Sequence, residues 1–363
     1  MLSRFVADLL DCLKKTKPGE FQVVVMPDFF LDRLITYEED AQDFVKIVAE
    51  VAERKGGSIH GIGQMEMRGG NAANTTAALA KLGIRVCPII NTDPLGLHLL
   101  KFYLQPLGVD LSHVKTQGKI ALTTALEVLH EGERVNVMMS TLGSLPDFGL
   151  ESMKEEDFEA LKQADCVCVF HWACTRRHGT ELAEEVFRYV KEEGRGKTYY
   201  DTSDPQPNLK AIPDLMNKVL LGKYIDVLSV NENEAFCYAS QLGANGSGLR
   251  RRLKPDELAV ECARILAKHL SARIDLHTTT LAGSFSQGNE VAVPAFKVPV
   301  VRSTGAGDAW NAGNILGDAL GLSDACRLTL ANAVAAYYIS DPAAEHPTLR
   351  QLEKFCSRFQ DEL

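Results

Sequence analysis

The sequence predicts an α/β fold with a central, mostly parallel sheet, helices on both faces and a small lid that contains β-strands. Short apolar runs rich in β-branched residues alternate along the chain with amphipathic helical segments. Such repeated strand–helix units build parallel sheets covered by helices, because each crossover returns over one face of the sheet. One hairpin pattern interrupts the alternation and is the candidate lid.

Breaker residues separate the elements expected in the first third of the chain. Pro18-Gly19 ends the first helix, Pro27-Asp28 ends the first strand, and Gly56-Gly57 ends the second helix. The expected elements are a helix at 1–17, a strand at 21–26, a helix at 38–55, a loop or strand through Met67, a helix at 75–82, a strand at 86–90 and a helix near 95–105.

The hairpin comes next, and the alternation then resumes. Its two strands, 120–129 and 134–140, flank His130-Glu131-Gly132-Glu133 and show the period-two pattern of a half-buried strand. Further elements are expected as strands at 166–170, 197–201, 225–230 and 273–278, and as helices at 179–193, 256–270 and from 308. We expect one domain over residues 1–363, with lid elements near 33–67 and 118–140.

Composition limits the class of partner. The 363 residues carry a net charge of -9, which argues against nucleic acid because phosphate backbones select basic surfaces. No apolar run has the length that crosses a membrane, and Asp8 and Asp11 interrupt the stretch that a secretory signal would need. The nine cysteines are scattered without a C-x-x-C pair, which is typical of thiols in a reducing compartment. We therefore expect a cytoplasmic protein with no membrane partner.

A loop of small residues, Ser303-Thr304-Gly305-Ala306-Gly307, joins the extended segment 295–301 to a helix that begins at Asp308. Unpaired amides at a helix N-terminus bind anions, and glycines let a ligand approach the backbone. Asp308 by itself is also explained as a residue that caps the first turn or favours the helix dipole. A carboxylate beside a bound phosphoryl group would repel it, unless the carboxylate takes a proton from a hydroxyl that attacks the phosphorus. The loop therefore indicates phosphoryl transfer with Asp308 as the base.

Two other phosphate-binding motifs are absent from the sequence. No G-x-x-x-x-G-K-[ST] segment occurs, which excludes a P-loop. The segment Gly305–Trp310 lacks the last glycine of G-x-G-x-x-G and lies near the C-terminus, whereas a dinucleotide-binding fold places that motif on an early strand. A nicotinamide-dependent dehydrogenase is therefore disfavoured.

Two separated segments together resemble the signatures of the PfkB/ribokinase family of carbohydrate and nucleoside kinases. Thr304-Gly305-Ala306-Gly307-Asp308-Ala309 is similar to the family's T-G-A-G-D-x-F segment, with Trp310 in the aromatic place. Gly69-Gly70-Asn71-Ala72-Ala73-Asn74 is similar to its G-G-x-x-x-N segment. The resemblance covers residues from about 21 to about 340 and implies a ribokinase-like three-layer αβα sandwich.

The resemblance implies roles for matching residues. Asp308 corresponds to the catalytic base, and Gly305, Ala306 and Gly307, with Thr304, correspond to the anion hole for the transferred phosphoryl group. Asp32, Gly69, Gly70 and Asn74 correspond to positions that bind the acceptor, although Pro27 replaces the family's glycine before Asp32. The alternatives are a simple helix-entry turn for the glycine pair and a surface position for Asp32.

A third segment implies which residues bind the nucleotide phosphates and Mg²⁺. Asn231-Glu232-Asn233-Glu234 resembles the family's N-x-x-E motif, in which Asn231 and Glu234 would organise Mg²⁺ and its waters beside the phosphates of ATP. The same spacing equally fits a helix N-cap with a capping-box partner. By position, the resemblance also implies that Thr278, Gly283 and Asn332 contact the nucleotide.

The chain departs from the family at Arg302, where relatives usually have an aspartate that helps hold a monovalent cation. We expect no K⁺ requirement because Arg302 supplies a fixed charge; the alternative is that its side chain points to solvent. In the family the lid often forms a homodimer contact, so the resemblance also implies a homodimer through the lid. His171-Trp172, Asp201 and Asp204 follow strands at the carboxyl edge, where α/β sheets bind ligands, although packing or loop capping also explains them.

The sequence thus predicts an ATP-dependent kinase that uses Mg²⁺ and phosphorylates a hydroxyl of a sugar-like molecule. One alternative is a nucleoside kinase of the same family, in which Phe29, Phe30 or Trp172 stacks on the base. Another is a non-catalytic sensor of sugars or nucleotides on the same fold. The acceptor and the choice between ATP and ADP stay open.

Overall fold

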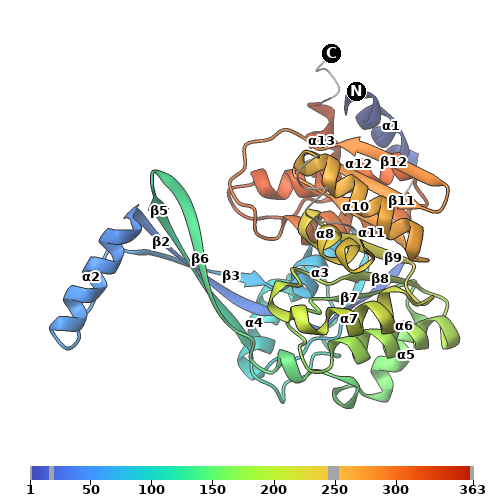
Figure 1. The fold of residues 1–363 in the computed structure, drawn as a ribbon. Helices are drawn as coiled ribbons and strands as arrows, with labels where there is room; N and C mark the ends of the chain where they lie inside the picture. Colours follow the sequence, from blue (N-terminus) through green and yellow to red (C-terminus); the bar gives the residue numbers. More distant parts are fainter. Residues whose placement is uncertain (1, 16–19, 244–252, 360–363) are drawn as a thin grey trace.

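Eight strands form the central sheet of the protein, for which a computed structural model describes residues 2–15, 20–243 and 253–359 (Figure 1). In spatial order they are β12 (Asn289–Pro294), β11 (Leu281–Ser286), β10 (Arg273–His277), β9 (Val227–Val230), β8 (Lys197–Asp201), β7 (Cys166–Phe170), β1 (Gln22–Met26) and β4 (Arg85–Pro88). The strands from β10 to β4 all pair in parallel, as the strand–helix alternation predicts.

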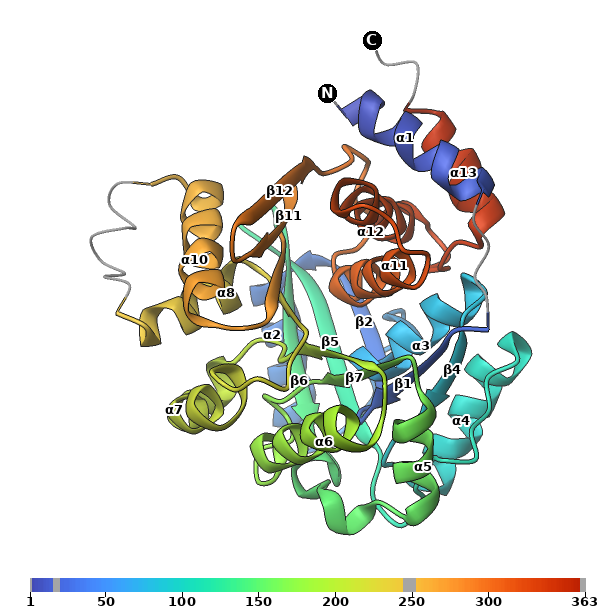
Figure 2. The same cartoon turned by 90° about the vertical axis from the view of Figure 1, so that its right-hand side faces the viewer.

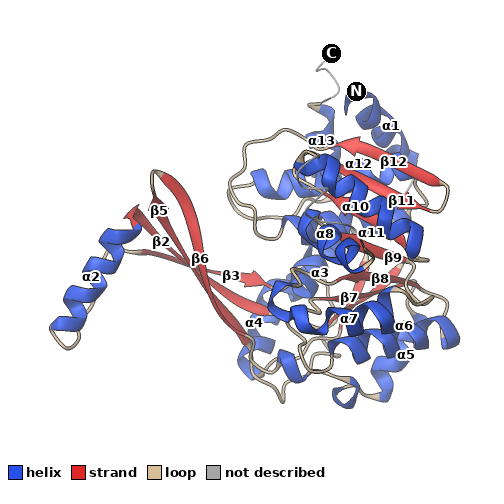
Figure 3. Ribbon diagram, in the orientation of Figure 1, coloured by secondary structure: helices blue, strands red, loops and turns tan. Residues whose placement is uncertain are grey.

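Helices cover both faces of this sheet (Figures 2 and 3). Val23 and Val25 of β1 pack into a core with helices α1, α3, α11, α12 and α13, whereas Val24 and Met26 pack on the other face with α5, α6, α7, α8 and α10. The alternation follows from the two-residue period of a strand. The prediction of a three-layer α/β fold is therefore confirmed.

The helices that were predicted in these layers lie within a few residues of their expected bounds, whereas no bounds were predicted for α5, α7, α8, α12 and α13. The helices of these layers are α1 (Leu2–Lys15), α3 (Asn71–Lys81), α4 (Pro94–Leu104), α5 (Glu155–Gln163), α6 (Gly179–Glu193), α7 (Ile212–Leu215, followed by a π-turn at Met216–Leu220), α8 (Glu232–Gln241), α10 (Pro255–His269), α11 (Ala306–Ala319), α12 (Asp324–Ser340) and α13 (Leu349–Ser357). The predicted stop at Pro18-Gly19 lies outside the described residues. Helix α3 begins four residues before the predicted Thr75, because Asp28 accepts hydrogen bonds from the amides of Asn71 and Ala72.

The antiparallel edge of the sheet was not predicted. Strands β11 and β12 form a hairpin on β10, and Gly288 turns the chain between them with φ of 82°. The extended strand expected at 295–301 is absent; the described chain is irregular there. Pro294, the last residue of β12, and Pro299 both lack an amide hydrogen to donate to a sheet, which disfavours a strand over 295–301.

A second sheet projects from the body and carries helix α2 (Ala41–Glu53) at its far end (Figure 1). Its strands, in order, are β3 (Gly63–Gly69), β2 (Phe30–Asp40), β5 (Ala121–His130) and β6 (Glu133–Thr141). The predicted hairpin is confirmed as β5–β6, whereas β2 was missed as a strand. We call this sheet with α2 the lid; it spans the two segments expected to form one.

None of the helices in the described part of the chain is both long enough and apolar enough to cross a membrane.

Candidate active site

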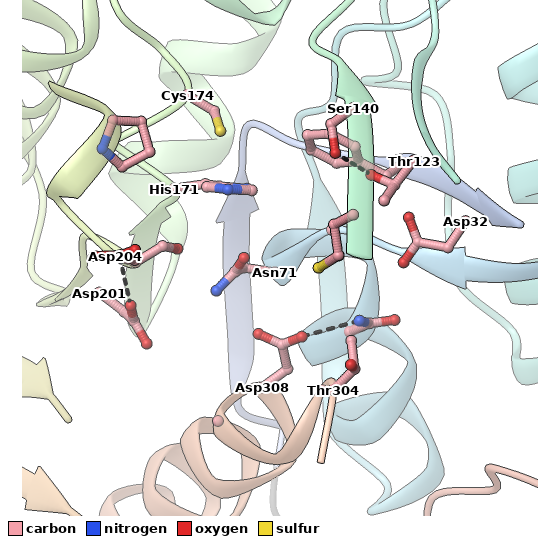
Figure 4. Close-up of a pocket in the computed structure, with 18 of the residues that line it drawn as sticks. Asp32, Asn71, Thr123, Ser140, His171, Cys174, Asp201, Asp204, Thr304 and Asp308 are labelled. Atoms are coloured by element: carbon pink, nitrogen blue, oxygen red, sulfur yellow. Dashed lines mark hydrogen bonds between the residues drawn. The ribbon is translucent and has the colours of Figure 1, made fainter. Parts of the chain in front are cut away.

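One cavity of about 590 Å³ lies at the carboxyl edge of the central sheet, between the body and the lid (Figure 4). Parallel strands end at this edge, so residues that follow different strands meet there. The body contributes His171 after β7, Asp201 at the end of β8, Asn231 after β9 and His277 at the end of β10, and the lid contributes Phe30, Asp32, Thr123, Met138 and Ser140.

The amino end of α11 forms the floor of this cavity. Gly305 is the N-cap of the helix, with φ of 83°, and a Cβ atom there would lie 2.8 Å from the hydroxyl of Tyr338. The amide of Ala306 donates to the carbonyl of Ser303 at 3.2 Å. Among the described residues, the amides of Gly305 and Gly307 donate to no backbone acceptor, so they are available to an anion.

Asp308 lies in the first turn of α11 and points into the cavity (Figure 4). Its side chain is buried, and Oδ2 accepts a hydrogen bond of 2.9 Å from Nδ2 of Asn74. Burial, assisted by the charges of Asp201 and Asp28, raises the pKa of Asp308 to about 7, although the Asn74 bond opposes this shift. A buried carboxylate with a pKa near neutrality is suited to general-base chemistry.

The amide of Asn74 is oriented by Arg68. Nε of Arg68 donates to Oδ1 of Asn74 at 3.1 Å, so the amide nitrogen of Asn74 faces Asp308. The three residues form a chain from strand β3 through α3 to α11. Asn74 was predicted to bind the acceptor; the structure places it at the cavity wall and in contact with Asp308.

Gly69 and Gly70 allow β3 to turn into α3 beside two carboxylates. A Cβ atom at Gly69 would lie 2.1 Å from Oδ2 of Asp32, and one at Gly70 would lie 2.8 Å from Oδ2 of Asp28. Gly70 is also the N-cap of α3, with φ of 92°. The glycine pair is therefore a helix-entry turn, as the alternative interpretation holds, and Gly70 also lines the cavity.

Asp28 was not recognised from the sequence, where Pro27-Asp28 was taken only as the end of a strand. It is fully buried and binds the amides of Asn71 and Ala72 as well as Nδ1 of His171, the last at 2.7 Å. Although burial acts against a charged ring, the Asp28 carboxylate holds the pKa of His171 well above its ordinary value. The signal for Asp28 was its place directly after a buried parallel strand.

Asp32 faces the cavity from strand β2 of the lid, opposite Asp201 (Figure 4). Burial, together with the charge of Asp28, raises the pKa of Asp32 to about 6, while a hydrogen bond with Thr123 acts in the opposite direction. The structure thus brings Asp32 into the same cavity as Asp308, away from the surface position that was the alternative.

Asn231 and Glu234 form the capping box of α8 and also line the cavity. Oδ1 of Asn231 accepts from the amides of Asn233 and Glu234, and Oε2 of Glu234 accepts from the amide of Asn231 at 2.9 Å. Burial, followed by the nearby charge of Asp201, raises the pKa of Glu234 well above its ordinary value. The capping alternative is therefore present in the structure, and it does not exclude contact with a ligand.

Three residues predicted to contact the nucleotide make protein contacts outside the cavity lining. Oγ1 of Thr278 accepts from the amide of Leu281, which closes the turn into β11. Gly283 lies inside β11, where a Cβ atom would meet the ring of Phe285 at 2.6 Å. Asn332 accepts from Nε1 of Trp310 and is buried. Their roles toward a nucleotide stay predictions.

The aromatic candidates differ in position. Phe30 lines the cavity, with its ring 5.4 Å from that of His171. Phe29 and Trp172 are buried in the core, and Nε1 of Trp172 donates to Oγ1 of Thr180. Of the three, only Phe30 is placed to stack on a ligand in this cavity.

Asp201 and Asp204 cap their loop and also line the cavity. Asp201 accepts from the amide of Ser203 and from Nδ2 of Asn311, and Asp204 accepts from the amide of Gln206. The Asn311 bond ties Asp201 to helix α11, three residues beyond Asp308. Loop capping, the alternative for both residues, is thus present together with a position in the site.

His277 was also missed as a member of the site. Its ring packs at a tilt against Trp310, with the ring centres 4.9 Å apart, lies beside Gly307, and lines the cavity. No described residue accepts from or donates to its buried Nε2. Burial lowers the pKa of His277, so the ring is neutral near pH 7.

Arg302 turns inward rather than to solvent. Nη2 donates to the carbonyl of Pro342 at 2.9 Å, while Nε and Nη1 are buried without a partner among the described residues. The side chain joins the loop before α11 to the segment after α12, next to the predicted anion hole.

The chain matches one described protein family. A family model described as pfkB family carbohydrate kinase matches residues 40–350, which is most of the chain. Comparison with curated protein sequences finds no match.

Several solved structures share the fold. The ribokinase of Cryptococcus neoformans var. grubii serotype A, solved with ADP, has a TM-score of 0.68 at 17% identity over 93% of this chain and 99% of its own. The adenosine kinase of Sinorhizobium meliloti has a TM-score of 0.68 at 18% identity over 94% of this chain and 99% of its own. The ribokinase of Arabidopsis thaliana, solved with ribose and ATP, has a TM-score of 0.68 at 18% identity over 93% of this chain and 99% of its own.

Proposed function

Because the chain belongs to the pfkB family of carbohydrate kinases, we propose that it transfers the γ-phosphoryl group of ATP to a hydroxyl of a sugar-like acceptor. The observation that carries the proposal is Asp308, a buried carboxylate with a pKa of about 7 that faces the cavity at the amino end of α11. A carboxylate in this position takes a proton at the pH of the cell, and the amides beside it receive the phosphoryl group.

In the proposed reaction, Asp308 accepts the proton of the acceptor hydroxyl. The hydroxyl oxygen forms a bond to the γ-phosphorus, the bond from that phosphorus to the bridging oxygen breaks, and ADP leaves with the electron pair. The amides of Gly305 and Gly307 hold the equatorial phosphoryl oxygens, with Thr304 beside them. Asn74 keeps the carboxylate of Asp308 in place through its bond of 2.9 Å.

The acceptor side of the cavity carries Asp32, Gly70 and Asn74. A carboxylate and an amide bind sugar hydroxyls well, and the Arabidopsis ribokinase was solved with ribose and ATP. A nucleoside acceptor is the second candidate, because Phe30 offers an aromatic face in the same cavity and a relative of this fold is an adenosine kinase.

The donor side suits Mg²⁺. Asp201, Asp204 and Glu234 line the cavity, and none of them forms an ion pair with a cationic side chain of the described residues. Carboxylate oxygens without cationic partners fit Mg²⁺, which usually keeps several waters. No three potential ligands in the described ranges lie close enough to hold a metal directly, so we propose that these residues hold it through water. The bound ion would neutralise the charge of the nucleotide phosphates.

We expect kcat/KM to rise as pH increases through about 7, because Asp308 acts as a base only when it is ionised. The sign follows from the raised pKa of Asp308: at lower pH the carboxyl is protonated and cannot accept the acceptor proton. A pH–rate profile at saturating Mg²⁺ measures this step. A profile that stays flat across neutral pH would contradict the assignment of the base.

We expect the rate to be independent of K⁺, because the Arg302 guanidinium already occupies the region between the 301–304 loop and the carbonyl of Pro342. The measurement compares initial rates in K⁺, Na⁺ and choline salts at constant ionic strength. A rate that rises strongly and only with K⁺ would show that the site needs a monovalent cation in addition to Arg302.

The reaction is tested by a panel of sugars, sugar alcohols and nucleosides with ATP or ADP as donor. Release of product nucleotide that depends on one acceptor class supports the kinase and selects between the sugar and nucleoside candidates. Tight binding of acceptor and nucleotide without turnover would support a sensor instead.

The lid exposes several apolar side chains, including Val45, Val137 and Met139. Such a surface is compatible with a homodimer formed through the lid. The dimer stays a prediction, which the mass of the protein in solution tests.

A further inference from the structure

A second cavity, of about 200 Å³, lies between the lid and the body and adjoins the candidate active site. Five residues belong to the walls of both cavities: Asp32, Asn74, Thr123, Met138 and Thr304. The remaining walls come from the lid strands and from Val301, Arg302 and Tyr338. Its volume is much larger than the roughly 30 Å³ that one water occupies in the liquid, so it has room for a chemical group.

Two arginines line this second cavity, Arg68 from β3 of the lid and Arg302 from the loop before α11. Among the described residues, no carboxylate forms an ion pair with either guanidinium. Arg68 donates a hydrogen bond from Nε to Asn74, and Arg302 donates one from Nη2 to the carbonyl of Pro342. Nε and Nη1 of Arg302 are buried without a partner among the described residues. Cζ of Arg68 also lies 5.9 Å from the centre of the Tyr103 ring. Buried cationic donors without partners, such as those of Arg302, are costly, and an anion that binds them removes that cost.

The carboxylates of the second cavity do not neutralise these arginines. Glu127 lies 3.7 Å from Arg134 of the lid hairpin, and Asp32 bonds with Thr123. Tyr338 lines the same cavity: burial raises the pKa of its hydroxyl, and the charges of Arg68 and Arg302 both act against this shift. The second cavity therefore holds two guanidinium groups that pair with no carboxylate of the described residues, and it lies beside an acidic reaction centre.

We infer that the acceptor carries an anionic group, such as a phosphate monoester, which Arg68 and Arg302 bind in the second cavity while its reacting hydroxyl meets Asp308. Planar guanidinium groups bind phosphate and carboxylate through paired hydrogen bonds, and two of them match a doubly charged phosphate. Asn74 contacts both Arg68 and Asp308, so one small molecule can span the two cavities. This inference rests on the proposed kinase function.

The first test compares turnover of matched acceptors: a sugar, the same sugar as a monophosphate, and the corresponding sugar acid. We expect kcat/KM to be at least about 100-fold higher for an anionic member, since losing a charged hydrogen-bonded partner typically costs a few kcal/mol. Preference for the monophosphate identifies phosphate as the anion, and preference for the acid identifies carboxylate. Neutral sugars or nucleosides that react as well as their anionic counterparts would overturn the inference.

The second test uses Arg302→Gln and Arg68→Gln. We expect KM for the anionic acceptor to rise by at least about 30-fold in each, with KM for ATP nearly unchanged. Arg302→Gln is the cleaner variant, because Arg68 also orients Asn74. Arg33→Gln is the matched control: Arg33 lies next to Asp32 on β2, points to the opposite face and pairs with Glu66, so its KM should not change. Equal effects on neutral and anionic acceptors would overturn the inference.

Measuring the binding of anionic ligands in the absence of nucleotide tests this inference independently of the proposed kinase function. Titration calorimetry with a sugar monophosphate and with inorganic phosphate measures the anion site alone, and Arg302→Lys should retain more affinity than Arg302→Gln. If these ligands bind through the arginines but no acceptor is phosphorylated, the anion site stands and the kinase fails. If only neutral acceptors are phosphorylated, the kinase stands and the anion site fails.

Discussion

Asp308→Asn is expected to lower kcat by about 10²–10⁴-fold, the range that general-base catalysis contributes. Asparagine keeps the shape of the side chain and can still contact Asn74, but it cannot accept the proton of the acceptor hydroxyl. Acceptor affinity should stay within a few-fold, because the walls of the cavity are unchanged. Steady-state kinetics and binding of the acceptor in the absence of ATP measure the two quantities.

The fold should tolerate this change. The carboxyl of Asp308 keeps its proton up to about pH 7 in the folded protein, compared with an ordinary value of 3.8 in the unfolded chain. The folded state therefore binds more protons between these values, and the charged carboxylate costs stability above them. Removing that charge should leave the melting temperature at pH 8 equal or higher.

Asp256→Asn is the matched control, because Asp256 is an acid in the first turn of α10, remote from the cavity. If Asp308 only favoured its helix dipole, both variants would lose about 0.3–1 kcal/mol of stability and keep their activity. An active Asp308→Asn enzyme would thus establish the helix-capping alternative.

Gly305→Ala is expected to lower kcat by about 10²–10³-fold, as the loss of an oxyanion-type donor does. With φ of 83° the residue is in the left-handed region, and a Cβ atom would meet the Tyr338 hydroxyl at 2.8 Å. The loop must shift to relieve this contact, and the amides of Gly305 and Gly307 then leave the position where the phosphoryl group binds. KM for the acceptor should change much less than kcat.

Gly321→Ala is the control that separates the effect of backbone strain at a left-handed residue from the effect of a displaced anion hole. Gly321 follows the other end of α11 with φ of 63°, and nothing lies within 4 Å of a Cβ atom there. Both variants carry the cost of a left-handed alanine, but only Gly305→Ala disturbs the anion hole. Similar kinetics for the two variants would contradict the role given to the 305–307 amides.

The parts of the site that were predictable lie in local sequence patterns. Small residues and a helix with an early acid are contiguous at 303–308, so their geometry is fixed by neighbours in the chain. The 69–74 segment is recognisable for the same reason. The parallel sheet was also predictable, because each βα unit repeats the same pattern.

The rest depends on contacts between distant segments. Asp28 and His171 are in contact because β1 and β7 are neighbours in the sheet. The spacing of these residues in the sequence does not predict that the two strands pair. Arg68 and Arg302 line one cavity only because the lid folds toward the loop before α11. The β11–β12 hairpin was missed because its turn falls at Gln287-Gly288, between segments assigned to other roles.

The most direct test of the central claim is transfer of label from [γ-³²P]ATP to an acceptor hydroxyl, followed by identification of the labelled product. The account predicts a labelled phosphate ester formed by the wild-type protein with Mg²⁺, and none formed by Asp308→Asn under the same conditions. An acceptor and ATP that both bind to the wild-type protein without any labelled ester, or equal labelling by Asp308→Asn, would contradict it.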